Sequence, residues 1–159
     1  EIGLGIPAEP LFRSMGINLP TLEAMAYNFY GTDKVICPIM DARRNQVYTG
    51  IYSFENNGLS IYLDSSAMDI MELIPKLQEI DKPVIFTGDG IPVFRDIIDK
   101  ELKTPHEYGR AGFNRQRASS VALLGAELYK AGKTEKAEEH LPEYLRMSQA
   151  ERERMEKNG

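Results

Sequence analysis

Three aspartates in the middle of the chain are the residues best placed to do chemistry. Asp41 ends an apolar run, Asp64 ends an alternating one, and Asp89 stands between two glycines. Carboxylates at the ends of neighbouring strands can hold two Mg²⁺ ions, which promote in-line attack on a phosphodiester. Arg43 and Arg44 follow Asp41 closely, however, and favour an ion pair or a hydrogen-bonded loop over a bound cation. We therefore interpret Asp41 as a loop organiser and keep a Mg-dependent nuclease as the alternative.

A glycine-rich turn formed by Gly88, Asp89 and Gly90 is the second candidate. It follows a short apolar segment and precedes a helical pattern, where backbone N–H groups can face an anion. Asp89 places a negative charge in the same position, which opposes anion binding. We therefore favour a tight strand-to-helix turn, in which glycine permits positive φ, and retain these residues as weak anion-site candidates.

The sequence contains one cysteine, Cys37, and two histidines, His106 and His140, and their spacing provides no zinc site. Cys37 stands between Ile36 and Pro38 in an apolar run, so we predict a buried thiol and not a nucleophile. A lone cysteine cannot form an internal disulfide, which is typical of intracellular proteins. We expect His106 to be a surface residue and not a catalytic base.

The composition is that of an ordinary globular domain. The chain has 159 residues, of which 42% are hydrophobic and 27% charged, with a formal net charge of −5. These values exclude a collagen-like chain, a low-complexity polymer and a disulfide scaffold. No apolar stretch approaches the roughly 20 residues of a membrane span, and the first residues do not form a signal peptide. We expect a cytoplasmic protein.

Basic residues gather in one segment although the net charge is negative. Between Lys103 and Arg117 there are 4 basic residues and 1 acidic residue, whereas residues 55–102 include 10 acidic ones. The basic side chains could meet a phosphate or an acidic partner: Lys103, Arg110, Arg115 and Arg117. A solvated connection is the favoured interpretation, because domains that bind nucleic acid alone usually carry a net basic face.

The first half of the chain predicts three antiparallel strands. They are Val35–Asp41, Gln46–Phe54 and a segment of alternating residues from Leu59 to Asp64. We expect Pro38 to fall at a bulge or an unpaired position, because proline has no N–H to donate. Asn57-Gly58 is a strong signal for a hairpin turn.

Helices and strands then alternate. Ser66 and Asp69 form a capping box before apolar residues at helical spacing from Ile70 to Ile80, and Pro75 predicts a kink or a restart. Pro83–Thr87 predicts a buried strand, and Pro92 suits the first residue of the next helix. The expected apolar stripe of that helix is Val93, Phe94, Ile97, Ile98 and Leu102. A last clear helix is expected from Ala118 to Ala131, with Gly132 as its stop.

Three antiparallel strands followed by helix, strand, helix, a short linking strand and helix is the order of the ribonuclease-H-like α/β sheet. The same sheet is the repeating half of the actin-like ATPase and sugar-kinase superfamily. Near the C-terminus, Leu141-Pro142 forces an extended step, and Ser148 with Glu151 makes a capping box that opens a short charged helix.

Three segments closely resemble the TsaB (YeaZ-like) family of tRNA threonylcarbamoyladenosine biosynthesis proteins. They are TLEAMAYN at Thr21–Asn28, CPIMDARRNQVYTGIY at Cys37–Tyr52 and PEYLRMSQAER at Pro142–Arg152. GDG and then RASSVALLGAELY, at Arg117–Tyr129, follow in the expected order. The resemblance covers nearly everything after Leu19.

The resemblance implies a non-catalytic subunit that pairs with a TsaD-type transferase, which holds the active site, while a TsaE-type ATPase supports turnover. The modified base lies next to the anticodon of tRNA. This chain would need no cofactor of its own, because ATP and a divalent cation serve the partner subunits. It would meet tRNA only through the complex and would self-associate, as a homodimer, when the partner is absent. The wider family has carried a glycoprotease label, but no zinc ligands or nucleophile with its base support a peptidase.

Family members begin with an N-terminal lobe that is not recognisable here. We therefore expect residues 1–20 to be an irregular remnant or linker, 21–147 a ribonuclease-H-like lobe and 148–159 a charged tail. Six residues are candidates for organising loops or contacting a partner: Asp41, Arg43, Arg44, Tyr144, Arg146 and Ser148. One of the two arginines is expected to pair with Asp41 by a bidentate bond, and the last three residues are expected to dock the tail.

Overall fold

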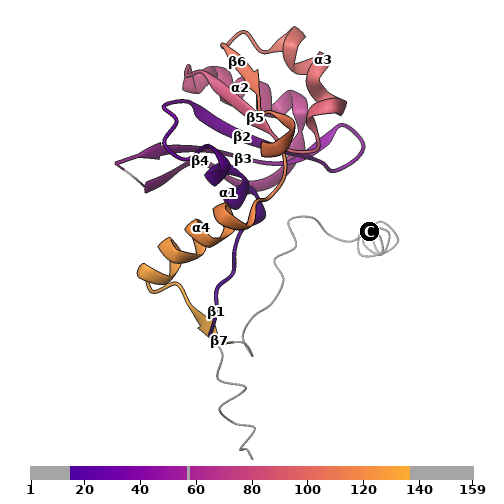
Figure 1. Cartoon of the computed structure of the whole chain (residues 1–159). Coiled ribbons are helices and arrows are strands. Elements are labelled where there is room, and N and C mark those ends of the chain that lie inside the picture. Colours follow the sequence, from indigo (N-terminus) through magenta and orange to yellow (C-terminus); the bar gives the residue numbers. More distant parts are fainter. Residues whose placement is uncertain (1–14, 57, 137–159) are drawn as a thin grey trace, which may run out of the picture.

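A five-stranded sheet with helices on both faces forms the body of the molecule (Figure 1). The computed structural model describes residues 15–56 and 58–136. The strands lie in the order β4-β3-β2-β5-β6. Their bounds are β2 (Val35–Asp41), β3 (Gln46–Glu55), β4 (Gly58–Asp69), β5 (Val84–Thr87) and β6 (His106–Tyr108).

The direction of the strands agrees with the predicted fold. β2, β3 and β4 are antiparallel neighbours, and β5 and β6 are added parallel to β2. Each parallel strand is reached through a helix, because a parallel neighbour requires a long crossover connection. α2 (Ile70–Ile80) leads to β5, and α3 (Ile91–Glu101) leads to β6. A further helix, α4 (Ala118–Lys130), follows β6. The chain therefore has the ribonuclease-H-like order that its sequence predicts.

Two separate cores lie on the two faces of the sheet. On one face α2 and α3 cover side chains such as Val35, Cys37 and Phe86. On the other face α1 (Thr21–Ala26) covers Ile36 and Tyr52, and α4 packs against α1. Alternate residues of β2 therefore enter different cores, which explains why this strand is apolar at nearly every position.

Two short strands join the ends of the described chain. β1 (Met15–Gly16) pairs antiparallel with β7 (Glu135–Lys136) beyond the C-terminal end of α4 (Figure 1). The sequence predicted neither strand, nor α1, nor the short helices η2 (Tyr27–Phe29) and η3 (Ala111–Phe113). A pair of two-residue strands offers too little periodicity to be recognised. No helix in residues 15–56 and 58–136 is long and apolar enough to cross a membrane.

The predicted capping box at Ser66 is wrong. β4 continues through this region, with Ser66 opposite Thr49, and α2 begins only after Asp69. The Asp69 side chain caps that helix by accepting a 2.8 Å hydrogen bond from the Met71 N–H. Pairing with β3 satisfies the backbone of residues 66–69, and this long-range interaction outweighs the local helix signal.

Other predicted details also need correction. The hairpin turn lies one residue earlier than expected, because Glu55 pairs with Gly58 and Asn56 takes a φ of 52°. α2 runs through Pro75 as one helix, so of the predicted kink or restart the restart is wrong. Val93 does not belong to the apolar stripe of α3, since its side chain is 56% exposed. Pro38 was expected at a bulge or an unpaired position. It has no partner on β3, since it lies between the paired residues Ile36 and Ile39.

The Gly88–Gly90 turn passes very close to the end of β2. Gly88 has a φ of 115°, and a Cβ there would collide with the Ile39 carbonyl oxygen. Gly90 donates its N–H to the same oxygen at 3.0 Å, and a Cβ on Gly90 would lie 2.9 Å from it. This is the tight strand-to-helix turn that the sequence favoured, and only glycine fits both positions.

We expect Gly88→Ala to lower the free energy of unfolding by at least about 3 kcal/mol, because it combines a disfavoured φ with a backbone collision. Gly112→Ala is the matched control, since no heavy atom lies within 4 Å of its Cβ position. We expect the control to change stability by less than about 0.5 kcal/mol. Urea unfolding followed by circular dichroism measures both, and equal effects would contradict the packing described for this turn.

Candidate functional site

Most of the candidate residues lie where β2 and β5 end. Because these strands are parallel, their carboxyl ends meet at the same edge of the sheet, and the loops that follow them are neighbours. The β2–β3 loop carries Asp41, Arg43 and Arg44, and the β5–α3 turn carries Asp89. The hydrogen bond from the Gly90 N–H to the Ile39 carbonyl holds the β5–α3 turn against β2.

Asp41 organises its loop through the backbone and not through an ion pair. Its Oδ1 accepts a 2.8 Å hydrogen bond from the Arg43 N–H, and the Gln46 N–H donates to the Arg43 carbonyl at 3.0 Å. The expected bidentate pairing with an arginine is therefore wrong: both guanidinium groups are exposed, and neither pairs with Asp41 in the described part of the chain. The loop points these side chains outward because three consecutive residues take left-handed φ: Arg43 (67°), Arg44 (53°) and Asn45 (60°).

The geometry of the Gly88–Gly90 turn does not favour anion binding. The Gly90 N–H is already donated to Ile39, and the exposed Asp89 carboxylate adds negative charge beside it. The three aspartates proposed for metal binding, Asp41, Asp64 and Asp89, do not gather either. Within residues 15–56 and 58–136 no three His, Cys, Asp or Glu side chains are grouped so that they could hold a metal ion. The arrangement therefore gives the nuclease hypothesis no support.

Cys37, in the central strand β2, is fully buried in the core under α2 and α3, as predicted. Its Sγ lies 3.5 Å from the Thr49 Oγ1, and that hydroxyl donates to the Pro38 carbonyl at 2.8 Å. Burial raises the pKa of the Cys37 thiol to about 12, because a thiolate would have to leave water without a compensating charge. The thiol is therefore protonated near neutral pH, which is the opposite of an activated nucleophile.

His106 is not the surface residue that the sequence suggested, since its side chain is only 15% exposed. Its Nδ1 lies 3.0 Å from the Thr104 carbonyl, and its Nε2 lies 3.0 Å from the Asp99 Oδ1. The Tyr108 hydroxyl donates to the same Asp99 oxygen at 2.6 Å. The hydrogen bond from Tyr108, and after it the one from His106, lowers the pKa of Asp99. Burial raises the pKa of Tyr108. The cluster ties β6 to α3 and occupies both ring nitrogens.

The loop that connects β6 to α4 is held by Asn28, a residue whose role the sequence did not reveal. The Asn28 Nδ2 donates 2.8 Å hydrogen bonds to the carbonyls of Phe113 and Arg115, and its Oδ1 accepts from the Ser120 hydroxyl at 2.7 Å. The Thr87 hydroxyl also donates to the Phe113 carbonyl, at 2.8 Å. The only signal was that Asn28 ends one of the family-like segments.

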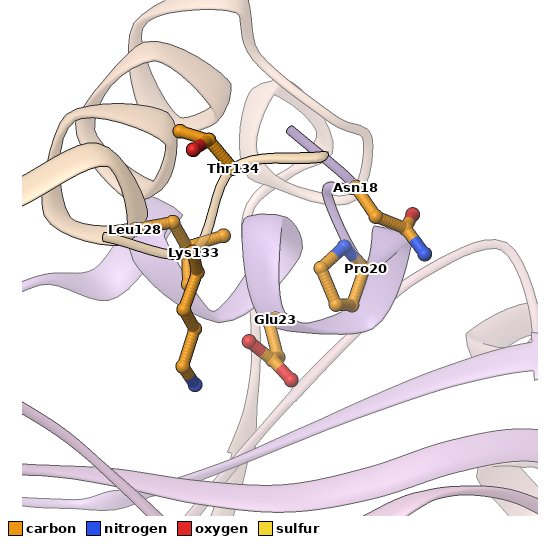
Figure 2. Close-up of a pocket in the computed structure, with 6 residues that line it drawn as sticks. All are labelled: Asn18, Pro20, Glu23, Leu128, Lys133 and Thr134. Carbon is orange, nitrogen blue, oxygen red and sulfur yellow. The ribbon is translucent and has the colours of Figure 1, made fainter. Parts of the chain in front are cut away.

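A hollow of about 360 Å³ lies between the start of α1 and the end of α4 (Figure 2). Its polar side chains include Glu23 from α1 and Lys133 from beyond α4, whose charged ends extend toward the same side in Figure 2. The other lining residues are Asn18, Pro20, Leu128 and Thr134. The sequence did not predict this hollow, because its walls come from distant parts of the chain.

Three candidates from the C-terminal tail, Tyr144, Arg146 and Ser148, lie outside the described residues, as does the expected helix that Ser148 opens.

The fold and the geometry of the described loops define a class of protein. It is an α/β lobe of ribonuclease-H-like and actin-like type, in which hydrogen bonds close the loops at the carboxyl edge of the sheet.

Comparison with known proteins narrows this class. The model of the TsaD family, described as tRNA N6-adenosine threonylcarbamoyltransferase, matches residues 15–154, and the chain belongs to this family. Within it the chain is TsaB-like. It is 35% identical over 133 residues to the tRNA threonylcarbamoyladenosine biosynthesis protein TsaB of Bacillus subtilis, a match that covers 82% of this chain and 56% of that protein.

Two solved structures from Pseudomonas aeruginosa share the fold. One is an uncharacterized protein with similarity to peptidase YEAZ (TM-score 0.62, 17% identity), and the other is YeaZ (TM-score 0.60, 18% identity). Each match covers 80% of this chain and 57% of the other. The chain thus spans little more than half the length of the relatives it matches.

We expect Asn28→Ala to destabilise the β6–α4 loop by roughly 2–3 kcal/mol, because the Arg115 carbonyl and the Ser120 hydroxyl lose their partner and the Phe113 carbonyl keeps only Thr87. Hydrogen exchange should become faster at residues 113–120 while α2 and α3 keep their protection. Gln116→Ala is the control, since this exposed neighbour lies in the same loop. Unchanged exchange in Asn28→Ala would show that the loop does not depend on Asn28.

We expect Cys37 to resist thiol reagents in the native protein and to react with one equivalent after unfolding, since the chain has 1 Cys. A raised folded-state pKa stabilises the fold fully below the ordinary value of 9.0, and this contribution is lost as pH rises toward about 12. The stability of the wild type relative to Cys37→Ala should therefore fall above about pH 9. Rapid labelling of the folded protein at neutral pH would contradict the burial.

Proposed function

We propose that this chain takes part in the formation of threonylcarbamoyladenosine in tRNA. The observation that carries the proposal is the 35% identity to TsaB of Bacillus subtilis, together with the match to the TsaD family over residues 15–154. Both point to the same modification. The matched part includes the sheet, its helices and the two loops at the carboxyl edge.

Within that process the chain acts as a non-catalytic subunit that pairs with a TsaD-type transferase. Three side chains of types that commonly act in catalysis take part in contacts that hold the lobe together. The Cys37 thiol is buried and protonated, Asp41 accepts from its own loop, and both nitrogens of His106 face hydrogen-bonding partners. These contacts favour a structural role for each group.

The word peptidase in the description of one Pseudomonas structure belongs to that protein, and at 17% identity the match carries the fold alone. A cysteine peptidase requires a thiolate beside a base. The Cys37 thiol is instead hydrogen-bonded to the Thr49 hydroxyl inside the sheet. The observations on this chain therefore favour the accessory subunit over a peptidase.

Reconstitution tests the proposal. Purified chain is added to a TsaD-type transferase, a TsaE-type ATPase, ATP, Mg²⁺, the threonylcarbamoyl donor and unmodified tRNA, and the nucleoside is measured by mass spectrometry. We expect the chain to bind the transferase and to raise modification, and to modify no tRNA when the transferase is omitted.

The Bacillus subtilis TsaB serves as the positive control, and Lys76→Gln, a change at an exposed residue of α2, as a variant whose fold and activity should match the wild type. Failure of the chain to bind the transferase, under conditions in which the control binds, would contradict the pairing. Modification of tRNA by the chain alone would contradict its non-catalytic role.

A further inference from the structure

The structure divides the basic segment of the sequence into two parts. Arg110, Arg115 and Arg117 all belong to the loop between β6 and α4, whereas Lys103 precedes β6 and lies at its opposite end. The three arginines are exposed, and none forms an ion pair with any residue in the ranges 15–56 and 58–136. We call residues 110–117 the arginine loop.

The arginine loop is rigid for a surface connection. Asn28 holds the carbonyls of Phe113 and Arg115, and Thr87 gives the Phe113 carbonyl a second donor. The Gly109 N–H donates to the Phe86 carbonyl at 2.8 Å, which fixes the start of the loop to β5. A loop that is ordered in advance loses little conformational entropy when it binds.

One arginine is combined with an aromatic ring. The guanidinium carbon of Arg117 lies 4.8 Å from the centre of the half-buried Phe113 ring. Phe113 in turn packs against Phe29, with ring centres 5.7 Å apart. Arginine guanidinium groups and aromatic rings are the side chains on which unpaired bases stack.

We propose that the arginine loop binds the phosphate backbone of RNA. This inference rests on the proposed function, which brings the chain to tRNA. Guanidinium groups match phosphate oxygens in a bidentate geometry, and the stacked Arg117 and Phe113 add a site for a base that an acidic peptide would not use. Because the whole chain carries a net charge of −5, the contact supplements binding by the assembly and is weak in the isolated chain.

The contact between the arginine loop and RNA is measured by the binding of a fluorescent tRNA to the isolated chain, followed by anisotropy at several salt concentrations. Three phosphates bound through arginine predict a slope of log K against log salt of about −2 to −3. We expect Arg110→Gln/Arg115→Gln/Arg117→Gln to weaken binding at least tenfold and to flatten the slope. The control is Lys76→Gln/Lys100→Gln/Lys130→Gln, which removes the same charge from helix surfaces and should bind like the wild type.

A lysine variant separates charge from geometry. Arg110→Lys/Arg115→Lys/Arg117→Lys keeps the charge but loses the bidentate and stacking contacts, so we expect the wild-type slope with affinity reduced about threefold to tenfold. Equal thermal unfolding curves for all variants establish that the fold is intact. The proposal is wrong if the arginine-to-glutamine variant binds tRNA as tightly as the control in which Lys76, Lys100 and Lys130 are replaced. It is also wrong if wild-type binding has no salt dependence.

Two outcomes distinguish this inference from the proposed function. If the chain stimulates modification but the arginine loop leaves tRNA affinity unchanged, only the RNA contact fails. If the loop binds tRNA but the chain neither binds nor stimulates the transferase, the proposed function fails while the contact stands. Loss of transferase binding in the glutamine variant, with unchanged tRNA affinity, would make the loop a protein interface and overturn the proposal.

Discussion

The burial of β2 on both faces is the constraint on which the rest of the structure depends. This strand lies at the centre of the sheet, with β3 on one side and β5 on the other, so its backbone bonds in both directions. Its side chains enter two cores, and each core needs its own helices. Near the end of β2, the chain turns from β5 into α3 against the Ile39 carbonyl, and only glycine fits at positions 88 and 90.

The rigidity of the surface follows from that packing. The β2–β3 loop is closed by Asp41 and the β6–α4 loop by Asn28 and Thr87, so the exposed arginines of both loops project from backbones that are already ordered. Cys37 and His106, which could act as nucleophile and base, are held by hydrogen bonds of their own, to Thr49 and to Asp99. A lobe of this kind suits a subunit that presents fixed surfaces, which agrees with the function proposed for it.

Local patterns predicted the elements whose neighbours are close in the chain or whose burial is uniform. β2 was predicted with its exact bounds, and α4 nearly so, because an apolar run and a glycine stop are local signals. Prediction failed where a distant partner decided the outcome. Ser66 became part of β4 because β3 offered pairing, and His106 was drawn inward because Asp99 on α3 offered a hydrogen bond. The Asp41 loop took left-handed φ values that keep the arginine side chains away from the carboxylate.

The sequence by itself determined the order of strands and helices, the burial of Cys37 and the family to which the chain belongs. Apolar periodicity and short motifs are properties of neighbouring residues, and they survive without knowledge of the fold. Only the tertiary structure decided which groups meet. It separated the three aspartates, split Lys103 from the arginine loop and gave Asn28 its central role, because these relations join residues up to 92 positions apart through the packing of α1 and α4 on the sheet.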